Sequence, residues 1–507
     1  MNKTAYPKFI LLHCTALLAT AAFSAPSLTL LRDSLLSENA LLMGGGYYGR
    51  AINGISYQEQ ILYTFDGYQY SAFYDTSGDT QRVVLARRAV DGAFIGEWET
   101  YSTDSEMLNG DEPDWNAHNV ISFGISESDG ALHLAWDHHN HSLRYRKSIP
   151  GLCTTNKEAW GEGMLGPEQN WLVDEATPEL DVTYPQFTNT LDGGLVFNRR
   201  FGISGNGDQY LQTYDPASGT WQKAFPFISR SGTYQGPNPH GETVTADERC
   251  AYINGIDFDQ RGQLHVTWTW RESARQFGNR DICYAFSPDL GKTWYNNDRI
   301  LIADTTKRET ITTDSPGITV VPLDMRQLMI NQQTQCVEAD GTVHVLMLHR
   351  RQDPGHEPSN FSALFSTKST AYYHYFRHHR TGQWQQRRIP PDAYPVGSRP
   401  RLALDAAGNL YAAYLSYPAG TEVFPGYRED DDRSVLVIAT ASQKSGYSDW
   451  QIQKVIDKDF DGEPLIDTAR LLKDGILSVY IQEHGPYPDG PALATPLHVY
   501  DFQTGRR

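Results

Sequence analysis

Short polar turns that end in glycine recur along the chain, and an apolar or aromatic strand-like run follows each turn. These glycines are Gly67, Gly130, Gly193, Gly262, Gly341, Gly408 and Gly475. Their spacings of 63, 63, 69, 79, 67 and 67 residues leave room for four antiparallel strands and their loops. A regular repeat of this length, with strand and turn signals, is typical of a propeller blade. The pattern therefore predicts an all-β protein, a seven-bladed β-propeller of four-stranded antiparallel blades.

One short motif supports this prediction. Residues 287–294 read SPDLGKTW and match the Asp-box, S-x-D-x-G-x-T-W, which forms the turn between the third and fourth strands of many propeller blades. In such a turn Asp289 accepts backbone N–H groups, Gly291 provides a positive φ, and the tryptophan packs between sheets. Weaker versions occur at 215–221 and 381–384. The motif indicates the fold but no single activity, because sialidases, lyases and binding modules all contain it.

The first residues have the features of an export signal. Lys3 and Lys8 precede the apolar stretch 9–23, and small residues follow it. We expect residues 1–25 to be a signal peptide and residues 26–507 to form a single propeller domain, secreted or periplasmic. The alternative, an uncleaved membrane anchor, is less favoured because the apolar stretch is short for a span and contains a histidine.

Composition narrows the range of partners. The hydrophobic content is 39%, and the 29 Tyr and 11 Trp suit a sheet-rich protein. A net charge of −18 argues against nucleic acid as a partner. An anionic polysaccharide is still compatible, because a locally basic groove can bind one. Basic and imidazole groups cluster at 138–147, 198–200, 349–351 and 372–380. We expect a monomer that contacts neither a membrane nor nucleic acid.

The repeat also predicts where the functional side chains gather. If each marked glycine joins the first and second strands of its blade, the far ends of those strands share the opposite face of the disc. His118 and His139 stand twelve residues before and nine residues after one marked glycine. Tyr184 and Arg200 stand nine before and seven after the next one. The register therefore predicts that these four side chains converge on one rim.

This group of side chains suits β-elimination at a uronic acid. An arginine neutralises the C6 carboxylate, a base removes the C5 proton, and an acid protonates the departing O4. No nucleophile elbow and no phosphate-binding glycine loop is present in the sequence. A glycosidase with two carboxylates is an open alternative, because acidic residues lie nearby in the sequence. They are Asp111, Glu112, Asp114 and Asp137.

The same residues carry a family resemblance. The stretch AHNVISFGISESDGALHLAWDHHNHSLRYR (117–146), with TYPQF (183–187) and NRRFG (198–202), resembles the BNR-repeat ulvan lyases. These are secreted seven-bladed propellers that cleave a sulfated rhamnose–uronate polysaccharide of green algae. The resemblance extends over most of the chain after the signal peptide and includes LHVTWTWRE (264–272) and the Asp-box.

The resemblance implies roles for four residues. His118 and Tyr184 are expected to transfer protons, with the base set by the C5 epimer, while Arg200 and His139 neutralise the carboxylate. This chain departs from the family in having three histidines close together, at positions 138, 139 and 141. His139 is preferred because an asparagine follows it. The alternatives are a sialidase-like or other glycoside hydrolase and a non-catalytic glycan-binding propeller.

Further residues are predicted to bind the substrate. Arg271 and Arg350 each lie nine residues after a marked glycine, at the height of the catalytic candidates. Asn119 and His138 adjoin two of those candidates and complete the predicted set. The alternative for the two arginines is a surface ion pair with a local acid, such as Glu272 for Arg271.

The cysteines suggest a structural metal, although the chemistry itself requires no cofactor. Cys336 and His344 should pair across one hairpin, and His265 and Cys283 stand at a similar height in the preceding repeat. Together they predict a Cys₂His₂ zinc site that joins two blades, far from the catalytic rim. The more ordinary alternatives are disulfides or buried thiols.

Overall fold

The computed structural model describes residues 25–505, except for 44–50, 59, 77–79, 109–115, 274–277, 353–368, 391–397, 418–432 and 486–491. Apart from Ala25, the predicted signal peptide lies outside the described residues. Within the described part of the chain, no helix combines the length and the apolar character needed to cross a membrane.

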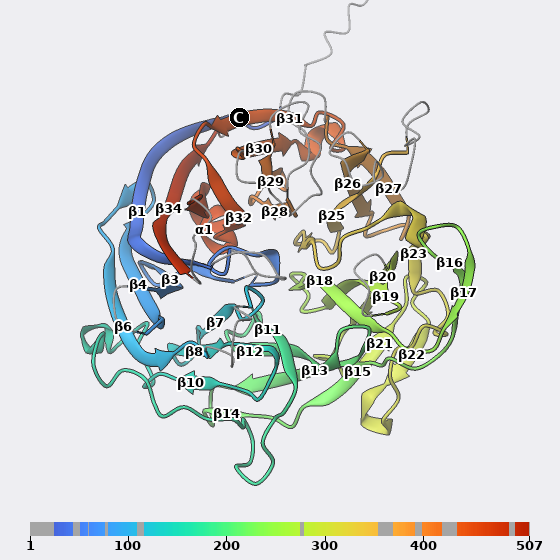
Figure 1. The fold of residues 1–507 in the computed structure, drawn as a ribbon, viewed down its shortest axis with the longest axis horizontal. Coiled ribbons are helices and arrows are strands. Elements are labelled where there is room, and N and C mark those ends of the chain that lie inside the picture. The colour runs from blue at the N-terminus through green and yellow to red at the C-terminus, as the bar shows by residue number, and fades with distance from the viewer. Residues whose placement is uncertain are drawn as a thin grey trace, which may run out of the picture.

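The architecture is an all-β propeller, with sheets arranged around a central axis (Figure 1). The described strands from both ends of the chain share one nine-stranded sheet in the order β32-β33-β34-β1-β3-β4-β5, in which β2 also pairs with β3 and β6 with β4. Its strands are β1 (Leu28–Met43), β2 (Leu62–Phe65), β3 (Tyr68–Asp75), β4 (Arg82–Asp91), β5 (Phe94–Ile95), β6 (Glu99–Glu106), β32 (Phe460–Ile466), β33 (Ile476–Glu483) and β34 (Ala492–Thr504).

The next sheets along the chain position the candidate site. A three-stranded sheet contains β7 (Ile121–Ser126), β8 (Ala131–Trp136) and β10 (Tyr145–Lys147). A six-stranded sheet contains β9 (His139–His141), β11 (Val182–Asn189), β12 (Leu195–Ile203), β13 (Asn206–Asp215), β14 (Thr220–Trp221) and β15 (Phe225–Ile228). A two-stranded ribbon of β16 (Tyr234–Pro237) and β17 (Thr243–Ala246) follows.

Three further sheets complete the described ring. A six-stranded sheet contains β18 (Cys250–Phe258), β19 (Leu264–Arg271), β20 (Asn279–Ser287), β21 (Thr293–Tyr295), β22 (Leu301–Asp304) and β23 (Thr319–Val321). One four-stranded sheet is formed by β24 (Thr334–Val337), β25 (Val343–Arg350), β26 (Thr370–Arg377) and β27 (Trp384–Arg388). Another is formed by β28 (Arg401–Leu404), β29 (Leu410–Ser416), β30 (Val435–Ala441) and β31 (Gln451–Ile456).

The recurrent glycines occupy the predicted turns. All seven have a left-handed φ, between 65° and 90°, and each comes just before a strand that is paired with the strand preceding it. At Gly475 the connection also contains the short helix α1 (Thr468–Asp474), which this glycine caps. An L-side chain rarely adopts such a φ, so glycine is favoured at these turns.

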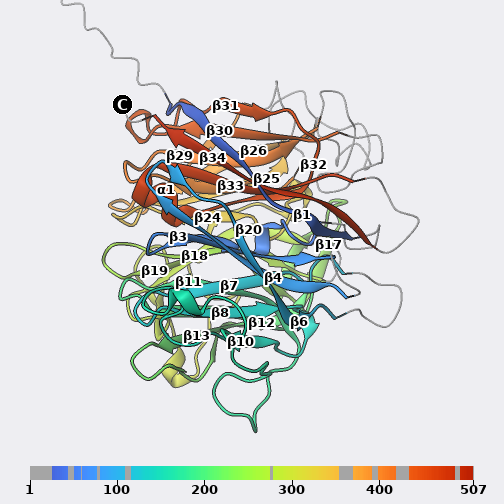
Figure 2. The ribbon, with the colours of Figure 1, turned by 90° about the vertical axis from the view of Figure 1, so that its left-hand side faces the viewer.

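The two ends of the described chain close the ring. Strand β1 pairs antiparallel with β34 from Leu28↔Thr504 to Met43↔Ala492. In Figure 1 the blue β1 lies beside the red β34, and Figure 2 views the ring from the side on which they meet. The ring is thus held shut by hydrogen bonds between strands far apart in the sequence, which leaves no free sheet edge at that point.

The Asp-box forms the predicted turn between β20 and β21. Asp289 accepts hydrogen bonds from the backbone N–H and the hydroxyl of Thr293, at 2.8 and 2.7 Å. Gly291 has a φ of 87°. Trp294 is fully buried and stacks on Phe227 of the neighbouring sheet, with ring centroids 5.0 Å apart. The motif therefore acts structurally, as the sequence predicted.

Candidate active site

The four predicted catalytic side chains lie together on one rim. His118 precedes β7, His139 begins β9, Tyr184 lies in β11 and Arg200 in β12. The imidazole rings of His118 and His139 are stacked, with centroids 4.7 Å apart, and the His139 ring lies 5.8 Å from the Tyr184 ring. The Arg200 guanidinium carbon is 5.4 Å from the centre of the Tyr184 ring. The strand register thus brings together the residues that it predicted.

The backbone around Tyr184 departs from regular strand geometry. Tyr184 has a φ of 50° and sits where the β11–β12 register shifts between Thr183 and Gln186. Its amide N–H donates to the His138 carbonyl oxygen, at 3.3 Å. A bulky residue with positive φ in a bulge is strained, and such strain is characteristic of functional sites. The bulge explains how the Tyr184 side chain leaves the regular alternation of its strand.

Asn116 fixes the orientation of His139. The amide oxygen of Asn116 accepts the His118 backbone N–H at 3.0 Å, so its NH₂ group faces Nδ1 of His139 at 2.7 Å. Because that nitrogen accepts a hydrogen bond, the neutral imidazole carries its proton on Nε2. His139 therefore presents an N–H donor, which suits the binding of a carboxylate.

Both histidines are held neutral. Burial, reinforced by the neighbouring His139, lowers the pKa of His118 well below its usual value. Burial and the Arg200 charge lower the pKa of His139 to about 3. A neutral imidazole can accept a proton, whereas an imidazolium cannot. His118 is therefore in the protonation state that a general base requires.

Arg200 is charged and Tyr184 is protonated, which complements the two neutral histidines. Arg200 is 1% exposed, and although burial acts to lower its pKa, Tyr252, Cys250 and Tyr184 raise the pKa above its usual value. Arg200 is thus a fixed cation. Burial raises the pKa of Tyr184, which keeps its hydroxyl protonated and able to donate a proton. A neutral base, a proton donor and a cation therefore lie within one cluster.

Tyr252 belongs to this cluster and was missed by the sequence analysis. Its ring lies 6.3 Å from the Tyr184 ring and 5.4 Å from the Arg200 guanidinium carbon. Its hydroxyl accepts a hydrogen bond from Nη1 of Arg271 at 3.1 Å. Tyr252 stands ten residues before Gly262, much as Tyr184 stands nine before its own glycine, so the same register could have identified it.

Arg271 joins the site through Tyr252 and not through its sequence neighbour Glu272. Glu272 does not pair with Arg271, because this buried carboxylate holds Arg249 at 3.0 Å and Arg280 at 2.6 Å. The Arg271 charge instead contributes to lowering the pKa of His118 and His139. Arg271 is therefore a partly exposed cation beside the catalytic candidates.

Tyr57 and Arg399 enter the site from other parts of the ring. The Tyr57 ring stacks on His118 at 5.4 Å and lies 4.4 Å from the Tyr184 ring. The buried Tyr57 hydroxyl has no hydrogen-bond partner among the described residues. Arg399 forms an ion pair with Glu463 at 2.9 Å, and its charge opposes protonation of His118. Tyr57 stands ten residues before Gly67 and Arg399 stands nine before Gly408, so the same register could have identified both.

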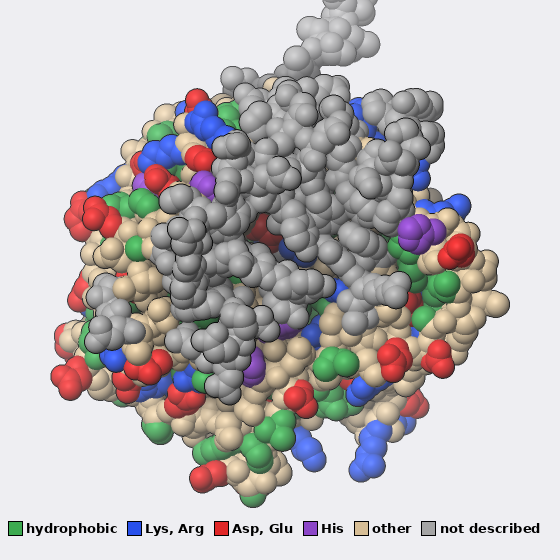
Figure 3. Space-filling model, in the orientation of Figure 1, with side chains coloured by type: hydrophobic (Ala, Val, Ile, Leu, Met, Phe, Trp, Pro, Cys, Tyr) green, Lys and Arg blue, Asp and Glu red, His purple; other side chains and the backbone are tan. Residues whose placement is uncertain are grey.

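The other predicted substrate-binding residues differ in their placement. His138 is completely buried and its Nε2 accepts the Arg144 backbone N–H at 2.9 Å, so direct contact of His138 with substrate is not supported. Asn119 is 4% exposed, and its carbonyl oxygen accepts the Tyr74 hydroxyl. Arg350 is the last residue of β25 and is half-buried. Figure 3 shows His and basic side chains near the centre of this face.

The acidic residues considered for a glycosidase give that alternative no support. Asp111, Glu112 and Asp114 lie outside the described residues. Asp137 is fully buried, pairs with Arg144 at 2.6 Å and accepts the Tyr74 hydroxyl at 2.7 Å. Burial raises the pKa of Asp137 to about 6. Its carboxylate is therefore enclosed by structural partners.

The predicted zinc site is not assembled in the described structure. Cys336 does pair with His344 across the β24–β25 hairpin. However, His265 pairs with Phe286 while Cys283 pairs with Trp268, three positions further along the strand pair. This odd offset places His265 and Cys283 on opposite faces of the sheet. Within the described ranges, no three His, Cys, Asp or Glu side chains are grouped to hold a metal ion.

The partners of His344 and the packing of the two cysteines are consistent with this outcome. Nδ1 of His344 lies 3.0 Å from Nε2 of His374, and its Nε2 lies 2.9 Å from a Glu338 oxygen. The two cysteines contribute to different hydrophobic clusters. All four cysteines of the described chain are buried free thiols, which agrees with one of the ordinary alternatives.

Comparisons with known proteins agree on the fold. The sequence profile of the BNR repeat-containing family matches residues 68–391. The solved structure of polysaccharide lyase Uly1 superposes with a TM-score of 0.66 at 16% identity, covering 94% of this chain and 99% of that one. A PL25 ulvan lyase bound to -[GlcA(1-4)Rha3S]- superposes with a TM-score of 0.62 at 12% identity, covering 94% and 98%.

Curated relatives match a smaller part of the chain. A long-isoform ulvan lyase of Alteromonas sp is 25% identical over 285 residues, which is 48% of this chain and 26% of that protein. A long-isoform ulvan lyase of Pseudoalteromonas sp. (strain PLSV) is 24% identical over 277 residues, again 48% and 26%. The matched part is thus about a quarter of the length of these relatives.

Proposed function

Because the chain belongs to the BNR repeat-containing family, we propose that it is a polysaccharide lyase that cleaves ulvan, a sulfated uronate-containing algal polysaccharide, by β-elimination. The observation that carries this proposal is the cluster of two neutral histidines and a protonated tyrosine against a buried arginine. The ulvan lyases among the relatives and structural neighbours support the choice of substrate.

The mechanism follows from the protonation states. Arg200 and the Nε2–H of His139 bind the C6 carboxylate and make the C5 proton more acidic. His118 or Tyr184 removes that proton, its electron pair forms the C4–C5 double bond, and the C4–O4 bond breaks. The other residue protonates O4. In the protonation states described above, the neutral His118 can accept a proton and the protonated Tyr184 can donate one.

A substrate panel tests the proposed function. Purified protein is incubated with ulvan, a heparan-type glycan, alginate and pectin, and the near-ultraviolet absorbance of the conjugated double bond is followed. We expect the absorbance to rise with ulvan alone. Chain cleavage without new absorbance would indicate a glycoside hydrolase, and no cleavage of any glycan would indicate a binding propeller. If the absorbance rises only with another uronate polysaccharide, the proposed β-elimination would stand, but ulvan would be rejected as the substrate.

Arg271 is proposed to bind the anionic substrate beside the reacting sugar. Replacing it with alanine should raise KM about tenfold and change kcat much less, because such a group binds the ground and transition states alike. Steady-state kinetics on ulvan measures both constants. Arg308→Ala removes an exposed arginine that follows the 3₁₀ turn Thr305–Lys307 and serves as the control. An unchanged KM in Arg271→Ala would show that substrate binds elsewhere on the rim.

We also propose that the ring has seven four-stranded blades. The nine-stranded sheet supports this because, among the described residues, its two halves share a single register pair, Ala40↔Asp75. These halves are β32-β33-β34-β1 and the strands around β3. Each half would then be one blade. Residues 1–25 are proposed to direct export of the 26–507 domain, which mass spectrometry of the exported protein would test.

A further inference from the structure

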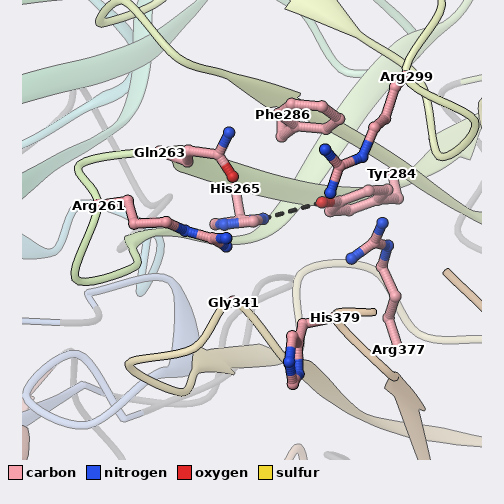
Figure 4. Close-up of a pocket in the computed structure, with 9 residues that line it drawn as sticks. All are labelled: Arg261, Gln263, His265, Tyr284, Phe286, Arg299, Gly341, Arg377 and His379. Carbon is pink, nitrogen blue, oxygen red and sulfur yellow. Dashed lines mark hydrogen bonds between the residues drawn. The ribbon is translucent and has the colours of Figure 1, made fainter. Parts of the chain in front are cut away.

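A second polar cleft lies between the sheet of β18–β23 and the sheet of β24–β27, away from the candidate active site. It is narrow and partly open to solvent, with a cavity volume of about 10 Å³, room for roughly one water molecule. Figure 4 shows its lining: Arg261, Gln263, His265, Tyr284, Phe286, Arg299, Gly341, Arg377 and His379. His265 is near the start of β19 and Arg271 is at its end, so about 20 Å separates this cleft from the catalytic rim.

Two arginines in this cleft are not neutralised by the described part of the chain. Arg377 is 5% exposed, and its Nε donates to the neutral amide oxygen of Asn297 at 2.8 Å. Neither Arg377 nor the exposed Arg299 has an acidic partner among the described residues. Figure 4 shows their guanidinium groups close to the Tyr284 hydroxyl. A buried guanidinium without a counter-ion is costly, so an anion in the cleft would stabilise it.

The carboxylates nearest the cleft are already paired. Asp259 is buried and holds the Arg261 guanidinium at 2.6 Å, and Asp340 lies 2.8 Å from Nδ1 of His379. Arg261 therefore offsets the charge of Asp259, whereas a histidine offsets a carboxylate only when it is protonated. Arg299 and Arg377 still leave the lining with more positive than negative charge, in a chain whose net charge is −18.

His265 supplies a further polar atom without a partner. The side chain is 2% exposed, and its Nδ1 lies 2.8 Å from the Tyr284 hydroxyl. Its Nε2 is 3.6 Å from an Asp259 oxygen, too far for a hydrogen bond, and has no hydrogen-bond partner among the described residues. The nearby carboxylate favours the proton on Nε2, so the ring presents a buried N–H donor beside the cleft.

We propose that this cleft, which we call the cationic cleft, binds a tetrahedral oxyanion, a sulfate or phosphate group. Arginine matches such groups because its N–H donors form parallel hydrogen bonds to their oxygens. The cleft suits a single anionic group better than a sugar chain, because it is small and its lining is polar. The group would come from the free ion or from a sulfate ester on the polysaccharide, and the second source rests on the proposed function.

The test is calorimetric titration of the purified protein with sodium sulfate and sodium phosphate in a dilute chloride buffer. We expect saturable binding of at least one anion at one site. Arg299→Gln should weaken it about tenfold, because the variant loses charge-assisted hydrogen bonds. Arg308→Gln is the matched control, since Arg308 is also exposed, also has a left-handed φ and does not line the cleft.

A second variant and a second ligand make the outcome decisive. Arg377→Gln should also weaken binding, with circular dichroism checking that it folds. Absence of saturable binding, or equal affinity in wild type, Arg299→Gln and Arg377→Gln, would overturn the proposal. Methyl rhamnoside 3-sulfate separates the two sources: tighter Arg299-dependent binding than inorganic sulfate indicates the polysaccharide, and weaker binding the free ion. Inorganic anion binding does not depend on lyase activity, so failure of the proposed function would leave it intact.

Discussion

Replacing Tyr184 with phenylalanine is expected to lower kcat on ulvan about 100-fold or more, the range observed for loss of a proton-transfer group. The substitution keeps the ring that packs against Tyr57 and His139 and removes only the hydroxyl. His118→Ala should have an effect of similar size, because it removes the neutral imidazole at the other end of the same cluster. Initial rates of absorbance increase with saturating ulvan measure both variants.

Tyr210→Phe is the matched control for this prediction. Tyr210 lies on β13, and its ring packs on Phe201 at 4.7 Å, outside the catalytic cluster. Its loss of a hydroxyl should leave kcat unchanged. Wild-type activity in Tyr184→Phe or in His118→Ala would reject the proton-transfer roles. Circular dichroism of each variant separates a catalytic loss from an unfolded protein.

The sequence predicted most of the site because a propeller repeats its register. A glycine with positive φ marks the same turn in every repeat, so counting residues from it locates the strand ends at the opposite rim. That count placed His118, His139, Tyr184 and Arg200 together, and the stacked rings confirm that they meet. The count also covered Tyr252, which was overlooked for want of a motif around it.

The same count also covered residues in two other repeats. Tyr57 stands ten residues before Gly67 and Arg399 nine before Gly408, and both reach the same rim. Like Tyr252, they were overlooked because no motif surrounds them. The four predicted zinc ligands do not come together for a different reason: similar height along a strand does not fix the face of the sheet. His265 and Cys283 differ by an odd number of positions and point apart.

The largest effect on stability is expected from Asp501→Asn. Asp501 lies on β34, is fully buried, and accepts hydrogen bonds from Arg88 of β4 and Arg470 of α1, each at 2.8 Å. Ser478 of β33 donates to the same carboxylate at 2.6 Å. Removal of its charge would leave two buried guanidinium groups without a counter-ion. The free energy of unfolding should fall by about 3–5 kcal/mol.

Asp457→Asn provides the comparison, because Asp457 pairs with Arg433 at 2.7 Å where both side chains are largely exposed. That variant should lose less than about 1 kcal/mol. Denaturant unfolding followed by tryptophan fluorescence measures both changes. Equal losses in the two variants would show that the buried cluster adds nothing beyond a surface pair. A much larger loss in Asp501→Asn would show that the side chains behind β1 and β34, as well as their backbone ladder, hold the ring closed.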